Sequence, residues 1–397
     1  MTRITVICND SDYFLRHRLH VVERLSATGA DVTVITGGRP MAKPTAGWRH
    51  EHMPIERFSF HPVLDAKVIR RSLRHFRTEK PDAVHLITLK PAVLSGLAAL
   101  LARRLGNGPR RILVTIPGLG RLMSPSSTRQ RTADRLARSM VDASIRFLSS
   151  QAGVHFTFET AEDRDDWLNR GLIGRHNSTV ISGAGVDPER FYPAADSRVR
   201  SPVRILFASR LLKAKGLDAF VETARHYSGN RKVEFLVAGM VEPHDPDRYA
   251  PELLEREGAI KFLGEVSDMP GLLRSVDLVC LPSRYGEGIP RILIEAAASA
   301  VPCLTTDLQG CREIVRHGVN GTLIPPGDPG AMAASMIAAI DGYLADPELL
   351  DRQGRAGLEL FRNGQFREDA VTEQFVRLLI DEGRAAGGSK PAALLPG

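Results

Sequence analysis

The chain has 397 residues, of which 43% are hydrophobic and 25% charged, an ordinary composition for a soluble globular protein. No uninterrupted apolar run reaches the ~18 residues that a membrane-spanning helix needs. The N-terminal MTRITVICND also lacks the basic and apolar regions of a signal peptide. We therefore expect a cytoplasmic protein of two domains, since domains usually contain about 100–200 residues.

The formal net charge of +7 is unevenly distributed along the chain. Residues 1–190 carry 29 Lys and Arg against 18 Asp and Glu, whereas residues 191–397 carry 24 against 28. A basic first half indicates either a solvated basic face or a contact with a lipid surface, a phosphate-bearing substrate or nucleic acid. Nucleic-acid binding would need aromatic residues interleaved with the basic ones. Aromatic residues make up only 6% of the chain and form no such patch, so no nucleic-acid partner is expected.

Short apolar runs alternate with helical patterns along the first half. Helices are predicted at 17–29 and 91–106, and strands at 3–9, 30–38, 82–88, 110–120 (running into a glycine turn), 153–160 and 178–187. Two further stretches, 61–77 and 128–148, carry Arg and Lys among apolar residues at helix-like spacing.

The same alternation restarts after the proline- and charge-rich stretch at 187–202. Helices are predicted at 217–228, 270–276, 290–300 and 328–346, and strands at 203–210, 233–239, 260–264, 277–283, 301–307 and 321–328. Strands separated by helices imply parallel β-α-β units. The prediction is an α/β chain with two doubly wound, Rossmann-like domains that face a cleft. Its boundaries are 1–190 and 191–365 for the domains, 366–383 for a helix packing back toward the first domain, and 384–397 for a disordered tail.

The loop RYGEGI after the predicted strand 277–283 is the first candidate for chemistry, because open parallel sheets bind ligands where strands end. Pro290 is predicted to be the first residue of the next helix. The backbone N–H groups of Gly288, Ile289, Arg291 and Ile292 would then be partly unpaired, face the cleft and could bind phosphate. We refer to residues 287–291 as the donor turn.

Two acids, Glu287 and Glu295, flank the phosphate-binding part of this turn. Carboxylates repel phosphate at contact, so they are better suited to accept hydrogen bonds from hydroxyl groups. A nucleotide sugar carries such hydroxyls on both sides of its diphosphate. The alternative reading is that Glu295 is an ordinary acid near a helix N-terminus, favoured by the helix dipole.

A second loop, RLLKAKG at 210–216, follows the strand 203–210 and belongs to the same domain. Arg210 and Lys215 could neutralise the two charges of a diphosphate. A basic loop alone is usually a solvated turn, and it becomes informative only beside the donor turn. The first strand ends read CNDSDY and ASRLLKAKG, without the G-x-G-x-x-G motif that a dehydrogenase would show.

Together these residues resemble the retaining glycosyltransferases of family 4, which have the two-domain GT-B fold. Three motifs carry the resemblance: E-x(7)-E at Glu287–Glu295, R-x(4)-K-G at 210–216, and G-V-D-x-x-x-F at 185–191. Residues 287–326, the triplet H-R-L at 17–19 and the turn TIPGLGR look like a branch that extends glycans on undecaprenyl diphosphate.

The resemblance implies catalytic roles for Glu287, Arg210 and Lys215. Arg210 and Lys215 would contact the donor diphosphate, Glu295 the ribose and Glu287 the donor sugar. The implied donor-binding set is Arg210, Lys215, Glu287, Gly288, Ile289, Pro290, Arg291, Glu295 and Gly239. The first domain would bind the acceptor, with Arg18, Asp12, Lys90, Gly118 and Gly120 on the acceptor side.

The implied activity is a hexosyl or N-acetylhexosaminyl transfer from a UDP-sugar to a hydroxyl of a lipid-linked or saccharide acceptor, with retention of configuration. No metal or other cofactor is expected, because fixed cations and helix N–H groups can stabilise the leaving group. A nucleotide-sugar epimerase of the same fold and a non-enzymatic nucleotide-sugar-binding module remain as alternatives.

Three further expectations follow from the sequence. The triplets Asp10-Ser-Asp12 and Asp245-Pro-Asp247 are too short to indicate a metal site, and the second is interpreted as a solvated loop. Four cysteines without a C-x-x-C pair are expected to be buried free thiols. The basic stretches at 61–77 and 128–148 predict peripheral attachment to the anionic inner face of the cytoplasmic membrane.

Overall fold

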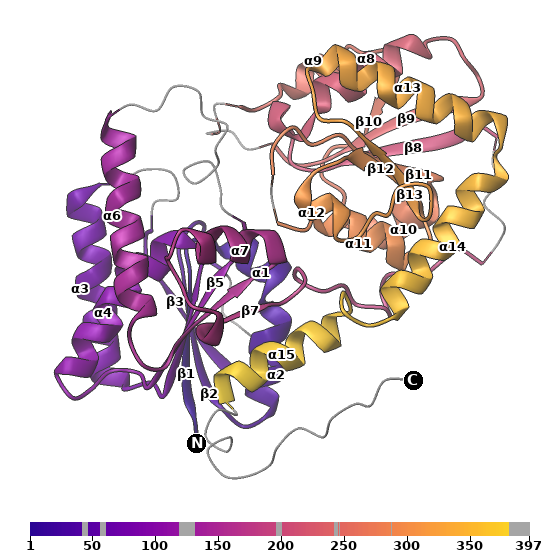
Figure 1. Ribbon diagram of the computed structural model, residues 1–397. Helices are drawn as coiled ribbons and strands as arrows, with labels where there is room; N and C mark the ends of the chain where they lie inside the picture. The colour runs from indigo at the N-terminus through magenta and orange to yellow at the C-terminus, as the bar shows by residue number, and fades with distance from the viewer. Residues whose placement is uncertain are drawn as a thin grey trace.

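A computed structural model describes residues 1–41, 47–55, 61–118, 132–195, 201–241, 245, 247–286 and 288–380. These residues form two α/β domains, drawn in indigo to magenta and in rose to orange in Figure 1. Some predicted features lie outside the described residues: Glu287, Gly120 with the rest of the turn at 119–121, residues 128–131 of the second basic stretch, residues 381–383 of the C-terminal helix and the tail at 384–397.

The first domain is built on a seven-stranded, wholly parallel sheet in the order β3-β2-β1-β4-β5-β6-β7. Its central strands are continuous apolar runs because helices cover both faces of the sheet. The strands are β1 (Arg3–Cys8), β2 (Asp31–Thr36), β3 (Trp48–His52), β4 (Ala83–Ile87), β5 (Arg111–Ile116), β6 (Val154–Phe158) and β7 (Ser178–Val180). The helices are α1 (Ser11–His17), α2 (Leu19–Ala27), α3 (Pro62–Glu79), α4 (Leu89–Arg104), α6 (Thr132–Ser149), α7 (Ala161–Asn169) and the 3-10 turn η1 (Arg175–Asn177).

The second domain repeats this plan with a six-stranded parallel sheet in the order β10-β9-β8-β11-β12-β13. The strands are β8 (Val203–Ala208), β9 (Val233–Ala238), β10 (Ile260–Phe262), β11 (Leu278–Leu281), β12 (Cys303–Thr306) and β13 (Gly321–Ile324). The helices are η2 (Lys213–Lys215), α8 (Leu217–His226), α9 (Pro251–Glu255), α10 (Met269–Arg274), α11 (Arg291–Ala298), α12 (Gln309–Arg312), α13 (Pro329–Ala345) and α14 (Glu348–Arg362). The predicted pair of doubly wound domains is thereby confirmed.

Two segments connect the domains and run side by side. The N–H of Val186 donates to the carbonyl of Phe366 (3.0 Å), and the N–H of Glu368 donates to the carbonyl of Val186 (3.0 Å). Gly185 has φ +75° and lies so close to Glu368 that a Cβ would stand 2.7 Å from its Cα. A side chain here would push the two connections apart, which explains the glycine of the G-V-D motif.

The last described helix, α15 (Glu368–Ile380), lies on the first domain although it follows the second in the chain (Figure 1). Its side chains Val371, Phe375 and Leu379 are buried in the same cluster as Val21 and Leu25 of α2. Burial of three large apolar side chains is worth several kcal/mol, at about 1.5–3 kcal/mol each. The chain therefore ties both domains together by its covalent path and by this packing.

Sequence patterns missed some elements. The edge strand β3 reads WRHEH and, among the described strands, pairs only with β2. Its polar residues lack the apolar pattern from which the other strands were predicted. The helices α1 and α14 were also not predicted. Pro290 is the N-cap residue of α11 rather than its first helical residue, with φ −64° and ψ 119°. The four cysteines are buried free thiols, as predicted.

Candidate functional site

The strand order of the second sheet reverses between β8 and β11, which lie side by side. The loops that leave their carboxyl ends are therefore neighbours, and this is where open α/β sheets bind ligands. One loop contains Arg210 and Lys215, and the other leads to the donor turn. The N–H of Arg284 donates to the carbonyl of Ala214 (2.9 Å), so the two loops are bonded directly to each other.

Lys215 ends the 3-10 turn η2 and is only 5% exposed. Its Nζ stands 5.5 Å from the ring centroid of Tyr285, which belongs to the second loop. Gly216 follows with φ +78°, and a Cβ there would collide with the carbonyl oxygen of Pro282. The glycine of the R-x(4)-K-G motif thus lets the two loops approach and places the lysine beside the donor turn.

The two aspartates of the triplet, Asp245 and Asp247, support this loop, so the interpretation of this stretch as a solvated loop was wrong. Asp245 is 6% exposed, and its Oδ1 accepts the N–H of Asp247 (2.9 Å). The carboxylate of Asp247 in turn accepts the N–H of Ala214 (2.7 Å). The carbonyl of Asp247 accepts the N–H of Lys213 (2.9 Å). These bonds fix the backbone just before Lys215.

Gly288 of the donor turn is tightly packed against the first domain. A Cβ on Gly288 would collide with the carbonyl oxygen of Pro117 and with Oε2 of Glu159. Glu159 also accepts a hydrogen bond from the backbone N–H of Ile289. The backbone N–H of Ile289 was predicted to bind phosphate, but in this structure it donates a hydrogen bond to the carboxylate of Glu159.

Arg291 and Glu295 form an ion pair along α11, with Nε to Oε1 at 2.8 Å. Glu295 is 9% exposed, and the guanidinium of Arg291 also bonds the carbonyl of Arg16 in the first domain. The side chain of Arg291 thus joins the domains, a role that the sequence did not indicate. Glu295 has one oxygen held by Arg291, which orients its carboxylate.

The acceptor-side candidates of the first domain occupy different positions. Arg18 is 1% exposed between α1 and α2, and Asp12 lies in the first turn of α1. Lys90 is buried and pairs with Asp65 at 2.9 Å. Gly118 is the last described residue after β5. Arg18 is paired with Glu159, and Gly118 follows Pro117. Since Glu159 and Pro117 both contact Gly288, Arg18 and Gly118 lie near the donor turn. Lys90 is instead paired with Asp65 of α3.

The structure adds Glu159, which the sequence analysis did not single out. This residue directly follows β6 and is 6% exposed. Its Oε1 accepts a hydrogen bond from Nη2 of Arg18 at 3.0 Å. Burial raises the pKa of Glu159 to about 7, against the opposite effect of Arg18. A signal was available, since a carboxylate at the carboxyl end of a predicted strand, here 153–160, lies at the edge where ligands bind.

Three further contacts between described residues join the two domains, and one more lies within the second domain. Gln309 of α12 bonds Thr160, the N-cap of α7, and Arg312 pairs with Glu162 at 3.4 Å. Arg16 of α1 pairs with Glu265 at 3.2 Å. Gly239 after β9 packs against Ser209, where a Cβ would collide with the carbonyl oxygen of Ser209. Among the described residues, no group of three or more His, Cys, Asp or Glu side chains is placed to hold a metal ion.

Two family models match the chain, one in each domain. The model of the glycosyl transferase 4-like domain matches residues 16–165, and that of the glycosyl transferases group 1 matches residues 202–341. The two matches divide at the same place as the two sheets.

Curated relatives agree with these matches. A phosphatidyl-myo-inositol mannosyltransferase of Mycobacterium leprae is 32% identical over 40% of this chain and 40% of its own length. A UDP-Gal:α-D-GlcNAc-diphosphoundecaprenol α-1,3-galactosyltransferase of Escherichia coli is 22% identical over 81% of both chains. The chain spans less than half of two further relatives, an exopolysaccharide phosphotransferase of Streptomyces coelicolor and an amylovoran biosynthesis glycosyltransferase of Erwinia amylovora (29% and 42%).

Solved structures share the fold at low identity. Sucrose-phosphate synthase from Thermosynechococcus elongatus superposes with a TM-score of 0.74 at 19% identity, covering 95% of this chain and 98% of its own. Anabaena HepE in complex with UDP and glucose superposes with a TM-score of 0.71 at 17% identity, covering 95% and 99%. The motifs at 185–191, 210–216 and 287–295, the two matched models and the paired parallel sheets agree: the chain belongs to the glycosyltransferases of family 4, which have the GT-B fold.

Proposed function

We propose that the protein transfers a sugar from a nucleotide diphosphate sugar, a UDP-sugar, to a hydroxyl of a lipid-linked or saccharide acceptor in the assembly of a bacterial surface glycan. One observation carries the proposal: the basic loop with Lys215 is bonded to the loop that leads into the donor turn, through Arg284 and Tyr285, at the reversal point of the second sheet. A cation and helix N–H groups carried by two adjacent loops suit the diphosphate of a donor.

The chemistry follows from what each group can stabilise. Cleavage of the bond between the sugar and the diphosphate leaves negative charge on the departing phosphate. Lys215, Arg210 and the N–H groups of the donor turn would stabilise that charge without a metal ion. Glu287 and Glu295 would accept hydrogen bonds from hydroxyls of the sugar and the ribose. Retention of configuration is proposed from the resemblance alone.

The names of the relatives support the donor and acceptor classes. The Escherichia coli relative is a UDP-Gal transferase acting on a diphosphoundecaprenol acceptor. A Rhizobium meliloti relative, 24% identical over 92% of this chain and 95% of its own, is a lipopolysaccharide core biosynthesis glycosyltransferase. The Anabaena structure holds UDP and glucose. We carry a UDP-sugar donor and a glycan acceptor to this chain on that basis.

The first prediction tests the donor. In a panel of uridine, guanosine and adenosine sugar nucleotides, we expect a uridine nucleotide sugar to raise the Tm most, because ligands that bind only the folded state stabilise it. At a ligand concentration of about 100 times Kd the gain is about 2.7 kcal/mol, which is several degrees. The ligand found should then support transfer to a lipid-diphosphate sugar.

Product analysis separates the remaining candidates. With donor alone, an epimerase would produce an epimerised nucleotide sugar, whereas a transferase would give only slow hydrolysis. A non-enzymatic binding module would show the Tm shift without any product. Absence of a shift with every nucleotide sugar would contradict the donor assignment.

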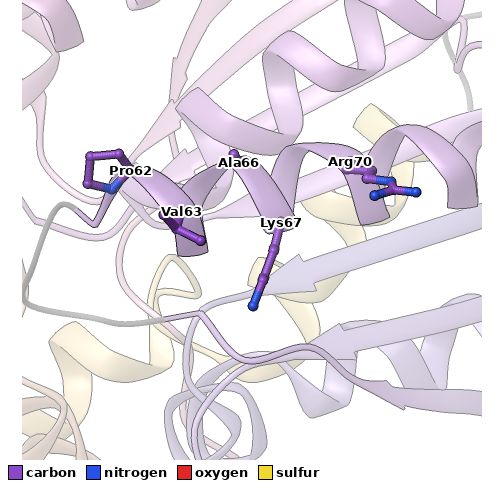
Figure 2. A pocket seen from close by; sticks show the side chains of 5 residues that line it. All are labelled: Pro62, Val63, Ala66, Lys67 and Arg70. Atoms are coloured by element: carbon purple, nitrogen blue, oxygen red, sulfur yellow. The ribbon is translucent and has the colours of Figure 1, made fainter.

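The first domain carries a face suited to an anionic membrane. The exposed cations of α3 are Lys67, Arg70, Arg71, Arg74 and Arg77. Figure 2 shows Pro62, Val63 and Ala66 beside Lys67 and Arg70 around a hollow on this helix. Large exposed apolar side chains also occur on α4 (Leu101), at its C-cap (Leu105) and on α6 (Met140 and Phe147). Helix α4 packs against both α3 and α6. No helix in the described ranges is long and apolar enough to cross a bilayer. We propose peripheral attachment through this face to the inner side of the cytoplasmic membrane.

The second prediction tests this attachment by flotation with vesicles rich in anionic lipid at low salt. We expect the wild type to float and the triple variant Lys67→Glu, Arg70→Glu, Arg74→Glu to bind at least about tenfold more weakly, since each cation near the surface is worth about 1 kcal/mol. A matched control reverses three exposed cations of the second domain, Arg231, Lys232 and Arg256. Equal losses in both variants, or no flotation of the wild type, would refute the proposed face.

A further inference from the structure

The buried pair of Arg18 and Glu159 has no role in the function proposed so far. Both side chains are almost fully inside the molecule, at 1% and 8% exposed, and their nearest atoms are 3.0 Å apart. Nη1 of Arg18 donates to the carbonyl of His17 (2.8 Å), while its Nε finds no hydrogen-bond partner in the part of the chain that the structure describes. Taking two charges out of water is costly, so this buried pair adds little net stability to the fold.

The carboxylate of this pair sits on the donor turn. Glu159 accepts the N–H of Ile289, and its Oε2 faces Gly288 at a point where no methyl group would fit. The other side of this contact is the carbonyl of Pro117. The N-terminus of α11 therefore already holds an anion that the protein itself supplies, in the place where a helix N-terminus attracts one.

We propose that Glu159 is a further residue of the donor site: its carboxylate occupies the anion position of the donor turn while the site is empty and yields that position to the donor diphosphate. This inference rests on the proposed function for the identity of the donor. Two anions on one N–H group at contact distance repel each other strongly in a buried place. Donor affinity then depends directly on the charge of Glu159.

Glu159 gives up the anion position by taking up a proton, which removes its negative charge. Burial raises the pKa of this carboxyl to about 7, so it gains or loses its proton close to neutral pH. Among the described residues, two charged groups act on it: Arg18 favours the carboxylate, and Asp163 of α7 disfavours it. An arriving diphosphate adds negative charge and raises the pKa of Glu159 further, because like charges favour the neutral form. Binding of the donor should therefore take up a proton.

The third prediction uses isothermal titration calorimetry with nucleotide sugars, whose diphosphates do not themselves titrate near neutral pH. We expect Glu159→Gln to bind about five- to tenfold tighter than wild type at pH 8, because the amide keeps an acceptor oxygen without the charge. Wild-type affinity should weaken by up to about tenfold per pH unit above 7, since binding is linked to one proton. The variant should show little dependence on pH.

Controls separate this effect from loosening of the interdomain contact. Glu162→Gln removes another carboxylate at the interdomain contact, paired with Arg312 and 61% exposed, and should leave affinity and its pH dependence unchanged. Asp163→Asn should keep the pH dependence, which identifies Glu159 as the titrating group. If Glu159→Gln leaves Arg18 unpaired and unfolds the protein, the double variant Arg18→Met, Glu159→Gln replaces it, with at least threefold tighter binding expected.

The outcomes distinguish the inference from the proposed function. Nucleotide-sugar binding with the same Kd and pH dependence in wild type and Glu159→Gln would overturn the inference and leave the function intact. Pyrophosphate that binds more tightly to the variant, with no nucleotide sugar binding, would support the inference and overturn the proposed donor. Failure of both probes to bind either protein would overturn both.

Discussion

Replacing Lys215 by alanine is expected to lower kcat/KM for sugar transfer by about 100- to 1000-fold, the usual loss when one fixed stabiliser of developing negative charge is removed. The lysine is 5% exposed and stands at the end of β8 beside the donor turn. A charge in such a place acts with little screening by water. Initial rates with the nucleotide sugar from the panel and a lipid-diphosphate acceptor measure the effect.

A matched control lies two residues away. Lys213 belongs to the same 3-10 turn but is exposed, so Lys213→Ala should retain at least about half of the activity. Thermal unfolding should show that both variants are folded. Wild-type rates in folded Lys215→Ala, or the same loss in Lys213→Ala, would contradict the assignment of Lys215 to the leaving group.

Replacing Glu287 by alanine is expected to abolish transfer, with a fall in kcat of about 1000-fold or more. Under the proposed function this carboxylate meets the donor sugar, and its hydrogen bonds orient the carbon that reacts. Misplacement of the sugar lowers kcat while the nucleotide part of the donor still binds. Kd for the free nucleotide should therefore change by less than about threefold, as calorimetry would measure.

The second acid of the motif provides the contrast. Glu295 is assigned to the ribose, and Glu295→Gln should raise KM several-fold with kcat within about threefold of wild type. Its ion pair with Arg291 at 2.8 Å would weaken as well, which stability measurements must take into account. Full activity in folded Glu287→Ala would contradict the contact of Glu287 with the donor sugar. A fall in kcat for Glu295→Gln as large as for Glu287→Ala would contradict the assignment of Glu295 to the ribose.

Local patterns in the sequence were sufficient to predict the two-domain architecture. Buried parallel strands read as continuous apolar runs such as RITVIC and VRILFA, and both became central strands. The donor turn and the loop of Lys215 were found because ligands of parallel sheets bind where strands end. Elements without such a pattern escaped prediction, as the polar edge strand WRHEH shows.

The sequence by itself determined the two doubly wound domains, the family motifs and the candidate donor residues, because each depends on residues close together in the chain. Only the tertiary structure showed which side chains contact these candidate donor residues. Glu159, Arg18 and Ile289 meet from positions up to 271 residues apart, and Asp247 supports Lys215 from across a loop. The contact between Glu159 and Ile289 arises where the two domains meet, whereas Arg18 reaches Glu159 within the first domain and Asp247 reaches Ala214 within the second. The burial and the proton affinity of Glu159 therefore follow from tertiary contacts rather than from its neighbours in sequence.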